Sequence, residues 1–257
     1  MTTNLRRILN PVMFGKKVID KIDNEFGSFT VEELVYEGRR ARVLFSGPMH
    51  SAQSGIPLDN DPHMLFDYNQ RLLEMSIELT PRKILMLGGG TMTLPMALIT
   101  ALPEAELTVV ELNAGMLTIA SKYFGFKQQP RIRLLITDAS KFMDQVEPAY
   151  DLIICDLYDN LTIPKVFRGV AFAEKLRRGL RPGGVVATNC ISAISGELSQ
   201  PMRQLCAAYS AGIGPVRIFK VDRHFAGWVP QNLIIVAAKS DNTISGLLRG
   251  CAEVPLP

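Results

Sequence analysis

Four short apolar segments of the chain are each followed by glycines or by an acidic residue. The segments and the residues after them are 83–87 with Gly88, Gly89 and Gly90, 107–110 with Glu111, 131–136 with Asp138, and 152–155 with Asp156. If these segments are strands of one open α/β sheet, the residues after them meet beyond its carboxyl edge, where such sheets bind ligands. The sequence therefore predicts a ligand site made of glycines and carboxylates.

The residue types at this predicted site suit a nucleoside. Glycines let the backbone approach a ligand closely, and the N-terminus of the following helix lies nearby. Glu111, 23 residues after Gly88, stands where an acid can accept two hydrogen bonds from ribose hydroxyls. Asp138 is placed to accept a hydrogen bond from an adenine amino group.

Other interpretations of the same residues stay open. An acid after a strand is often a helix N-cap, and Asp138 before Ala139 fits that interpretation. A dinucleotide-dependent enzyme is a further alternative. The G-x-G-x-x-G pattern of that class fails here, because Thr93 stands where the third glycine belongs.

The elements that position these residues follow from the hydrophobic pattern. Strand-like segments alternate with helix-like stretches from residue 83 to residue 189, which predicts an α/β fold with a parallel, doubly wound sheet. Segments 216–221 and 232–238 are joined by a loop too short for a helical crossover, so we expect an antiparallel hairpin there. Upstream, 30–36 and 42–45 flank a turn and indicate another hairpin, and 63–79 has helical spacing.

The pattern divides the chain into three predicted parts. Residues 1–60 hold an N-terminal helix and a small β domain, 61–240 a Rossmann-like nucleoside-binding domain, and 241–257 a C-terminal tail. The basic first 21 residues resemble a transit peptide in charge, but Pro11 interrupts their helix and no apolar core region follows. A terminal helix packed on the surface is the preferred interpretation.

Composition limits the class of protein. The chain has 257 residues, of which 47% are hydrophobic, and a net charge of +3, far from the basic stripe of a nucleic-acid binder. No apolar run approaches the roughly 18 residues of a membrane span. The four cysteines and three histidines are scattered, which predicts no metal site and free thiols in a reducing compartment. We expect a cytoplasmic protein without nucleic-acid or membrane partners.

Several blocks of the sequence resemble the spermidine synthase family of polyamine aminopropyltransferases. The blocks are 84–90, 109–111, 131–139, 150–156 and 180–184, together with N-terminal strands that end near Gln53 and Ser54. The resemblance implies an α/β, class I methyltransferase-like Rossmann fold, with a mostly parallel seven-stranded sheet and a small N-terminal β domain. It also implies S-adenosylmethionine or its decarboxylated form as co-substrate. The residues that would bind it are Gln53, Gly88, Gly89, Gly90, Thr91, Glu111 at the ribose, Asp138 at the adenine, and Ala139.

The resemblance also implies catalytic residues. The family's Asp-Ser-Ser/Thr-Asp-Pro stretch corresponds here to residues 156–160, in which both acids, Asp156 and Asp159, are kept. An amine attacking a sulfonium has a pKa of about 10 and is mostly protonated at pH 7, so a carboxylate is needed to hold it and take its proton. Asp156 has this role by the resemblance, Asp159 stabilises a second charge, and Tyr68 matches a family tyrosine. A turn at Asp159 and a cap at Asp156 are the structural alternatives.

Departures from the family pattern keep the reaction open. Thr91 stands where the family has the aspartate that faces the donor's amino group, and many methyltransferases have threonine there. Residues 221–227 bear no likeness to the family's polyamine-contacting loop. Aminopropyl transfer to a small amine acceptor is the first hypothesis, S-adenosylmethionine-dependent methyl transfer the second, and a non-catalytic nucleoside-binding protein the third. By the resemblance, the chain forms homodimers or larger homo-oligomers through its N-terminal β domain.

Overall fold

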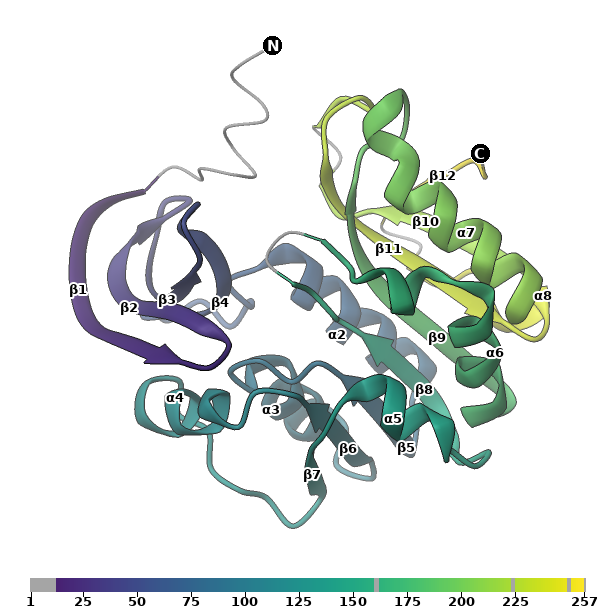
Figure 1. The fold of residues 1–257 in the computed structure, drawn as a ribbon, viewed down its shortest axis with the longest axis horizontal. Helices are drawn as coiled ribbons and strands as arrows, with labels where there is room; N and C mark the ends of the chain where they lie inside the picture. The colour runs from purple at the N-terminus through teal and green to yellow at the C-terminus, as the bar shows by residue number, and fades with distance from the viewer. Residues whose placement is uncertain (1–12, 160–161, 223–224, 249–250, 257) are drawn as a thin grey trace.

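The computed structural model describes residues 13–159, 162–222, 225–248 and 251–256. They form two sheets, each with its own core. A four-stranded antiparallel sheet in the order β1-β2-β3-β4 lies beside a larger eight-stranded sheet (Figure 1). The strands of the smaller sheet are β1 (Met13–Asn24), β2 (Gly27–Tyr36), β3 (Arg39–Ser46) and β4 (Ser51–Pro57).

The eight-stranded sheet has the order β12-β10-β11-β9-β8-β5-β6-β7. Its strands are β5 (Lys83–Leu87), β6 (Glu106–Glu111), β7 (Ile132–Ile136), β8 (Tyr150–Cys155), β9 (Leu180–Ser192), β10 (Val216–Lys220), β11 (Gln231–Ala238) and β12 (Ala252–Val254). The pairs that join β7, β6, β5, β8 and β9 are parallel, and β11, β10 and β12 are added by antiparallel pairing. Because the chain order reverses on the two sides of β5, a ligand crevice is expected beyond the carboxyl ends of β5 and its neighbours.

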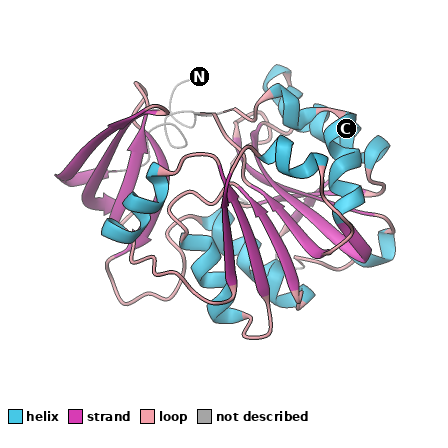
Figure 2. Ribbon diagram, turned by 60° about the horizontal axis from the view of Figure 1, so that its bottom comes forward, coloured by secondary structure: helices cyan, strands magenta, loops and turns pink. Residues whose placement is uncertain are grey.

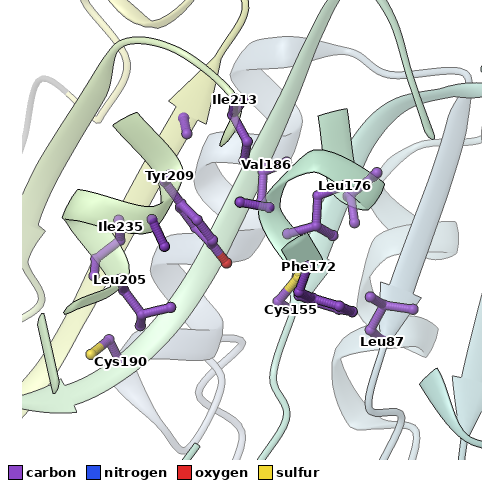
Figure 3. Packing of buried hydrophobic residues seen from close by; sticks show 14 of the residues in the cluster. Leu87, Cys155, Phe172, Leu176, Val186, Cys190, Leu205, Tyr209, Ile213 and Ile235 are labelled. Atoms are coloured by element: carbon purple, nitrogen blue, oxygen red, sulfur yellow. The ribbon is translucent and has the colours of Figure 1, made fainter. Parts of the chain in front are cut away.

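Helices cover both faces of this sheet (Figure 2). They are α2 (Asp67–Leu79), α3 (Thr93–Ala101), α4 (Gly115–Tyr123), α5 (Ala139–Asp144), α6 (Val170–Gly179), α7 (Gln200–Gly212) and α8 (Asp241–Ile244), with short 3₁₀ turns η1 (Lys165–Arg168) and η2 (Glu197–Ser199). One core packs the sheet against α5, α6 and α7, with Phe172, Leu176 and Tyr209 at its centre (Figure 3). The other packs the opposite face against α2, α3 and α8 through residues such as Leu72, Leu98 and Ile244.

The fold class predicted from the sequence is confirmed, and two details need correction. The sheet has eight strands among the described residues rather than seven, because β12, in the predicted C-terminal tail, pairs with β10. The predicted N-terminal helix is wrong over its described part, because Met13–Asn24 is the strand β1. Residues 1–12 of that prediction lie outside the described residues.

The reason for the second error lies in long-range pairing. β1 pairs with β2 from Met13 opposite Tyr36 to Asn24 opposite Gly27, and Ile19 and Ile22 pack against the core formed with α4. This pairing outweighs the weak local signal of a short basic segment, as tertiary context often does. The predicted hairpin of β2 and β3 is confirmed, but it lies in the middle of the small sheet, with β1 and β4 at the edges.

Candidate active site

A cavity of about 1490 Å³ lies between the small sheet and the carboxyl edge of the large one. It is lined by all of the residues that the sequence analysis assigned to the site, namely Gln53, Tyr68, Gly88, Gly89, Gly90, Thr91, Glu111, Asp138, Ala139, Asp156 and Asp159. Residues from both sheets and from α2 therefore meet at one place. The role of each residue stays a prediction.

The glycine turn after β5 is held by the carboxylate of Glu111 at the end of β6. One oxygen of Glu111 accepts hydrogen bonds from the backbone N–H groups of Gly89 and Gly90, both at 2.9 Å, and the other accepts from the N–H of Asn113 at 2.8 Å. Glu111 is buried. A carboxylate has about four acceptor positions, and three of them are used here, so roughly one position, on the oxygen that accepts from Asn113, is left for a ribose hydroxyl.

Gly88 is required for close packing in this turn. Its φ is +88°, and a Cβ atom added there would lie 2.2 Å from the backbone oxygen of Asp156. The turn after β5 and the end of β8 are thus in direct backbone contact. This contact places the predicted nucleoside-binding residues beside the predicted catalytic carboxylate.

Thr91 continues the glycine turn and connects it to the small sheet. It is buried, and its hydroxyl is hydrogen-bonded to the Ser54 hydroxyl on β4. Thr93 lies 3.4 Å from the same Ser54 oxygen. The neighbouring Gln53 donates a hydrogen bond from its side chain to the backbone oxygen of Ser51 at 3.3 Å. Thr91 therefore has a hydrogen-bond partner in the small sheet. Its position at the donor tail stays a prediction.

Asp138 is the N-cap of α5. Its carboxylate accepts a hydrogen bond from the Lys141 N–H at 3.0 Å, as the structural interpretation of the sequence requires. Asp138 and Ala139 also line the cavity, so capping and base binding are compatible at this position.

Asp156 lies just beyond β8 with two side-chain donors. The Tyr68 hydroxyl on α2 donates to one carboxylate oxygen at 3.2 Å, and the Asn189 amide donates to the other at 3.0 Å. Burial raises the pKa of Asp156 above its usual value, the two hydrogen bonds oppose that rise, and the nearby Glu111 carboxylate adds to it. A carboxylate with a raised pKa is better suited to accept a proton.

Asp159 stands in a different environment from Asp156. It is exposed, and its backbone forms a two-residue bridge with Thr162, with N–H to oxygen distances of 2.8 and 3.1 Å. The turn expected as the structural alternative covers residues 159 and 160, so it stays a prediction. Asn160, named with it in the sequence motif, lies outside the described residues.

The sequence analysis missed Asn189 as a site residue. β8 and β9 are parallel with Cys155 opposite Thr188, so the next residues, Asp156 and Asn189, emerge side by side. The Tyr158 hydroxyl fixes this edge by donating to the Asn189 backbone oxygen at 3.0 Å and accepting from the Ile191 N–H at 2.8 Å. The signal was available, because Asn189 ends a predicted strand just as Asp156 does.

Three further acids of the cavity lining, Glu37, Asp67 and Asp222, were also missed. Asp67 lies at the start of α2, and Asp222 follows β10 in the segment that bears no likeness to the family's polyamine loop. Phe225, from the same segment, also lines the cavity, while residues 223–224 lie outside the described residues.

The described residues carry neither a metal-binding group nor a membrane-spanning helix. In that part of the chain, no group of three or more His, Cys, Asp or Glu side chains is placed to hold a metal ion. None of the helices described there combines the length and the apolar character needed to cross a membrane.

The fold and the cavity define the class of protein. The large sheet, with its antiparallel end and its ligand cavity at the carboxyl edge, is a methyltransferase-like Rossmann fold carrying an N-terminal antiparallel sheet. The model of the spermine/spermidine synthase domain matches residues 65–227, which is more than half of the chain. The chain therefore belongs to the spermine/spermidine synthase family.

Curated relatives include two kinds of transferase. Spermidine synthase 2 of Arabidopsis thaliana is 30% identical over 118 residues, which are 44% of this chain and 34% of that protein. The polyamine aminopropyltransferase of Escherichia coli O1:K1 / APEC is 27% identical over 52% of this chain and 48% of its own. The eEF1A lysine and N-terminal methyltransferase of Bos taurus is 27% identical over 54% of this chain and 20% of its own. The matched region spans less than half of each of these relatives.

Solved structures show the same fold at low sequence identity. A probable spermidine synthase from Corynebacterium glutamicum has a TM-score of 0.72 at 21% identity, with 87% of this chain and 81% of that chain covered. A spermidine synthase in complex with the transition state analogue AdoDATO has a TM-score of 0.66 at 15% identity, with 90% and 75% covered. Human methyltransferase-like protein 13 in complex with SAH has a TM-score of 0.57 at 23% identity, with 68% and 83% covered.

Proposed function

We propose that this protein is a transferase that binds an S-adenosylmethionine-type nucleoside and moves an alkyl group from its sulfonium to a small amine acceptor. An aminopropyl group is the first candidate for the alkyl group. The observation that carries the proposal is the placement of Asp156. Its carboxylate, held by Tyr68 and Asn189, lines the same cavity as the glycine turn and Glu111. A proton acceptor beside a nucleoside cradle is what this reaction needs.

Each half of the cavity has a task in the proposed reaction. In the nucleoside half, Glu111 binds the ribose and Asp138 lies at the adenine. The glycine turn fits a closely approaching ligand, because a Cβ added at Gly90 would meet no atom within 4 Å, so the space beside the turn is open. In the acceptor half, the Asp156 carboxylate takes a proton from the acceptor ammonium. The freed nitrogen lone pair then forms the new C–N bond as the C–S bond breaks and its electrons return to sulfur.

Methyl transfer from S-adenosylmethionine is the second candidate, and Thr91 favours it. The side chain is uncharged where an aminopropyltransferase of the family has an acid, so the ammonium of a decarboxylated donor has no carboxylate there. The relatives named as methyltransferases also support this candidate.

The proposal is tested by product analysis. The protein is incubated with S-adenosylmethionine or its decarboxylated form and a panel of mono- and diamines, and products are identified by mass spectrometry. Aminopropylated amine together with methylthioadenosine supports the first candidate, and methylated product with S-adenosylhomocysteine supports the second. Absence of any nucleoside product with both donors, from protein that binds neither, would overturn the proposal.

We further propose that chains associate through the small sheet. β1 is an edge strand, and its Phe14 and Val18 side chains are 60% and 43% exposed. Such edges are usually covered. Light scattering at micromolar concentration is expected to give a multiple of 28.4 kDa, and a monomer would contradict this.

A further inference from the structure

The tip of the hairpin formed by β1 and β2 forms part of the cavity wall. Phe26, Gly27, Ser28 and Phe29 all line the cavity, although they lie in the small sheet and far from the nucleoside-binding motifs in sequence. Phe26 is 43% exposed, so its ring is only partly covered by the protein. An exposed aromatic ring at the wall of this cavity points to contact with something that the cavity binds.

This tip is held in place by polar contacts. The Asn24 amide donates to the Asn113 side-chain oxygen at 3.2 Å, and the Phe26 N–H donates to the Asn24 side-chain oxygen at 2.8 Å. The Asn113 side-chain oxygen also accepts a hydrogen bond from the N–H of Gly115, the first residue of α4, at 2.9 Å. The position of Phe26 is thus fixed relative to the loop that follows Glu111.

Further contacts connect the same hairpin to α4. Asp20 of β1 accepts hydrogen bonds from the Tyr123 hydroxyl and from the Lys122 ammonium, the latter at 3.3 Å. Phe29 packs in one core with Ile119 and Tyr123. Because α4 begins four residues after Glu111, these contacts place the hairpin on the nucleoside half of the cavity and not on the half that holds Asp156.

A second exposed apolar side chain lies in the same loop. Leu112 follows Glu111 directly, lines the cavity and is 51% exposed. It precedes Asn113, to which the hairpin is hydrogen-bonded. Leu112 and Phe26 are therefore two partly exposed apolar side chains at one cavity. Leu112 precedes Asn113, Phe26 lies two residues after Asn24, and Asn24 and Asn113 are joined by a hydrogen bond. A flat, largely apolar group is the kind of ligand that such a pair covers, and the base of a nucleoside is one.

We propose that Phe26 is a nucleoside-binding residue whose ring covers the base, so that the small sheet completes the nucleoside site of its own chain. The inference rests on the proposed nucleoside binding. It goes beyond that proposal, because it assigns a binding role to a hairpin that none of the motifs includes.

The test is the affinity for methylthioadenosine, measured by calorimetry on the full chain. Stacking of a base on an aromatic side chain predicts that Phe26→Ala weakens binding about five- to a hundredfold. The affinity of Phe26→Tyr, which keeps a ring, is expected to stay within about threefold of that of the wild type. A difference of that size is too small for a lost stacking contact. Ile77→Ala is the control, because Ile77 is an exposed apolar residue of α2 that neither lines the cavity nor belongs to the proposed association surface, and its affinity is expected to be unchanged.

The outcomes separate this inference from the proposed function. A wild type that does not bind methylthioadenosine overturns the proposed nucleoside binding and the inference with it. Wild-type binding with unchanged affinity in Phe26→Ala overturns the inference alone. If Phe26→Ala keeps its affinity and instead lowers the mass seen by light scattering, Phe26 covers a second copy of the chain and not a base. Thermal unfolding without ligand checks the fold, and since Phe26 is partly exposed, little change is expected.

Discussion

The two halves of the cavity are built in different ways. In the nucleoside half, the Glu111 carboxylate is held by three backbone N–H groups, and Gly88 leaves no room for a side chain against the backbone of Asp156. In the acceptor half, Asp156 is held by the side chains of Tyr68 and Asn189, and Asp159 is exposed.

This difference indicates which features can change among relatives. A carboxylate fixed by backbone amides is independent of neighbouring side chains, so the nucleoside half tolerates substitution around it. The acceptor half depends on side chains from α2, β9 and the segment after β10, each of which can change separately. The chain departs from the family pattern here, in residues 221–227, and also at Thr91 on the glycine turn. We infer that the donor nucleoside is common to the family and that the acceptor is particular to this chain.

The largest expected effect is on turnover, in the acceptor half. Asp156→Asn removes the proton acceptor while keeping the size and shape of the side chain, so we expect turnover to fall about 10²- to 10⁴-fold. Asp159→Asn, at an exposed residue, is the comparison and should lose less. The measurement is the initial rate of nucleoside product formation with saturating donor. Equal losses in both variants would show that the two acids act as a pair and that Asp156 has no separate role.

The next effect concerns donor choice at the boundary between the halves. Thr91→Asp adds attraction for the ammonium of a decarboxylated donor and repulsion against the carboxylate of S-adenosylmethionine. The ratio of the two affinities is expected to shift about ten- to a hundredfold toward the decarboxylated donor, as one charged hydrogen bond would give. Thr91→Asn controls for size and for the loss of the Ser54 contact. An unchanged ratio in Thr91→Asp would show that residue 91 does not face the donor tail.

The smallest effect is on stability and depends on pH. Burial raises the pKa of Asp156 in the folded state, so ionisation of this residue disfavours folding. Below the pKa that Asp156 has in the unfolded state, its carboxyl group is protonated in both states. The stability that the protonated form contributes is lost as the pH rises through the pKa that Asp156 has in the folded state. Asp156→Asn does not titrate, so its free energy of unfolding should become larger relative to that of the wild type from about pH 4 upward, and the difference should then level off. Urea titrations at several pH values measure it, and a difference that is constant with pH would contradict the assigned burial.

The nucleoside half could be predicted in more detail than the acceptor half. Glycines and acids at strand ends follow from local spacing, and the structure brings Gly88, Glu111 and Asp138 to one cavity. That Asn189 is the partner of Asp156 could not be predicted, because the two lie 33 residues apart and only the parallel register of β8 and β9 brings them together. β1 was mistaken for a helix for a similar reason, since its strand conformation comes from pairing with β2.

The separation of the two halves is tested most directly by calorimetric titration of methylthioadenosine into the wild type, Glu111→Gln and Asp156→Asn. Glu111→Gln keeps one acceptor oxygen but loses the charge that holds the glycine turn, so its affinity should fall about tenfold or more, in line with the strength of charged hydrogen bonds. The affinity of Asp156→Asn for methylthioadenosine should stay within about threefold of that of the wild type, because the proposed role of Asp156 is proton transfer and not nucleoside binding. Each unliganded variant is first shown to unfold cooperatively. Equal loss of affinity in both variants, or no binding by the wild type, would contradict the account.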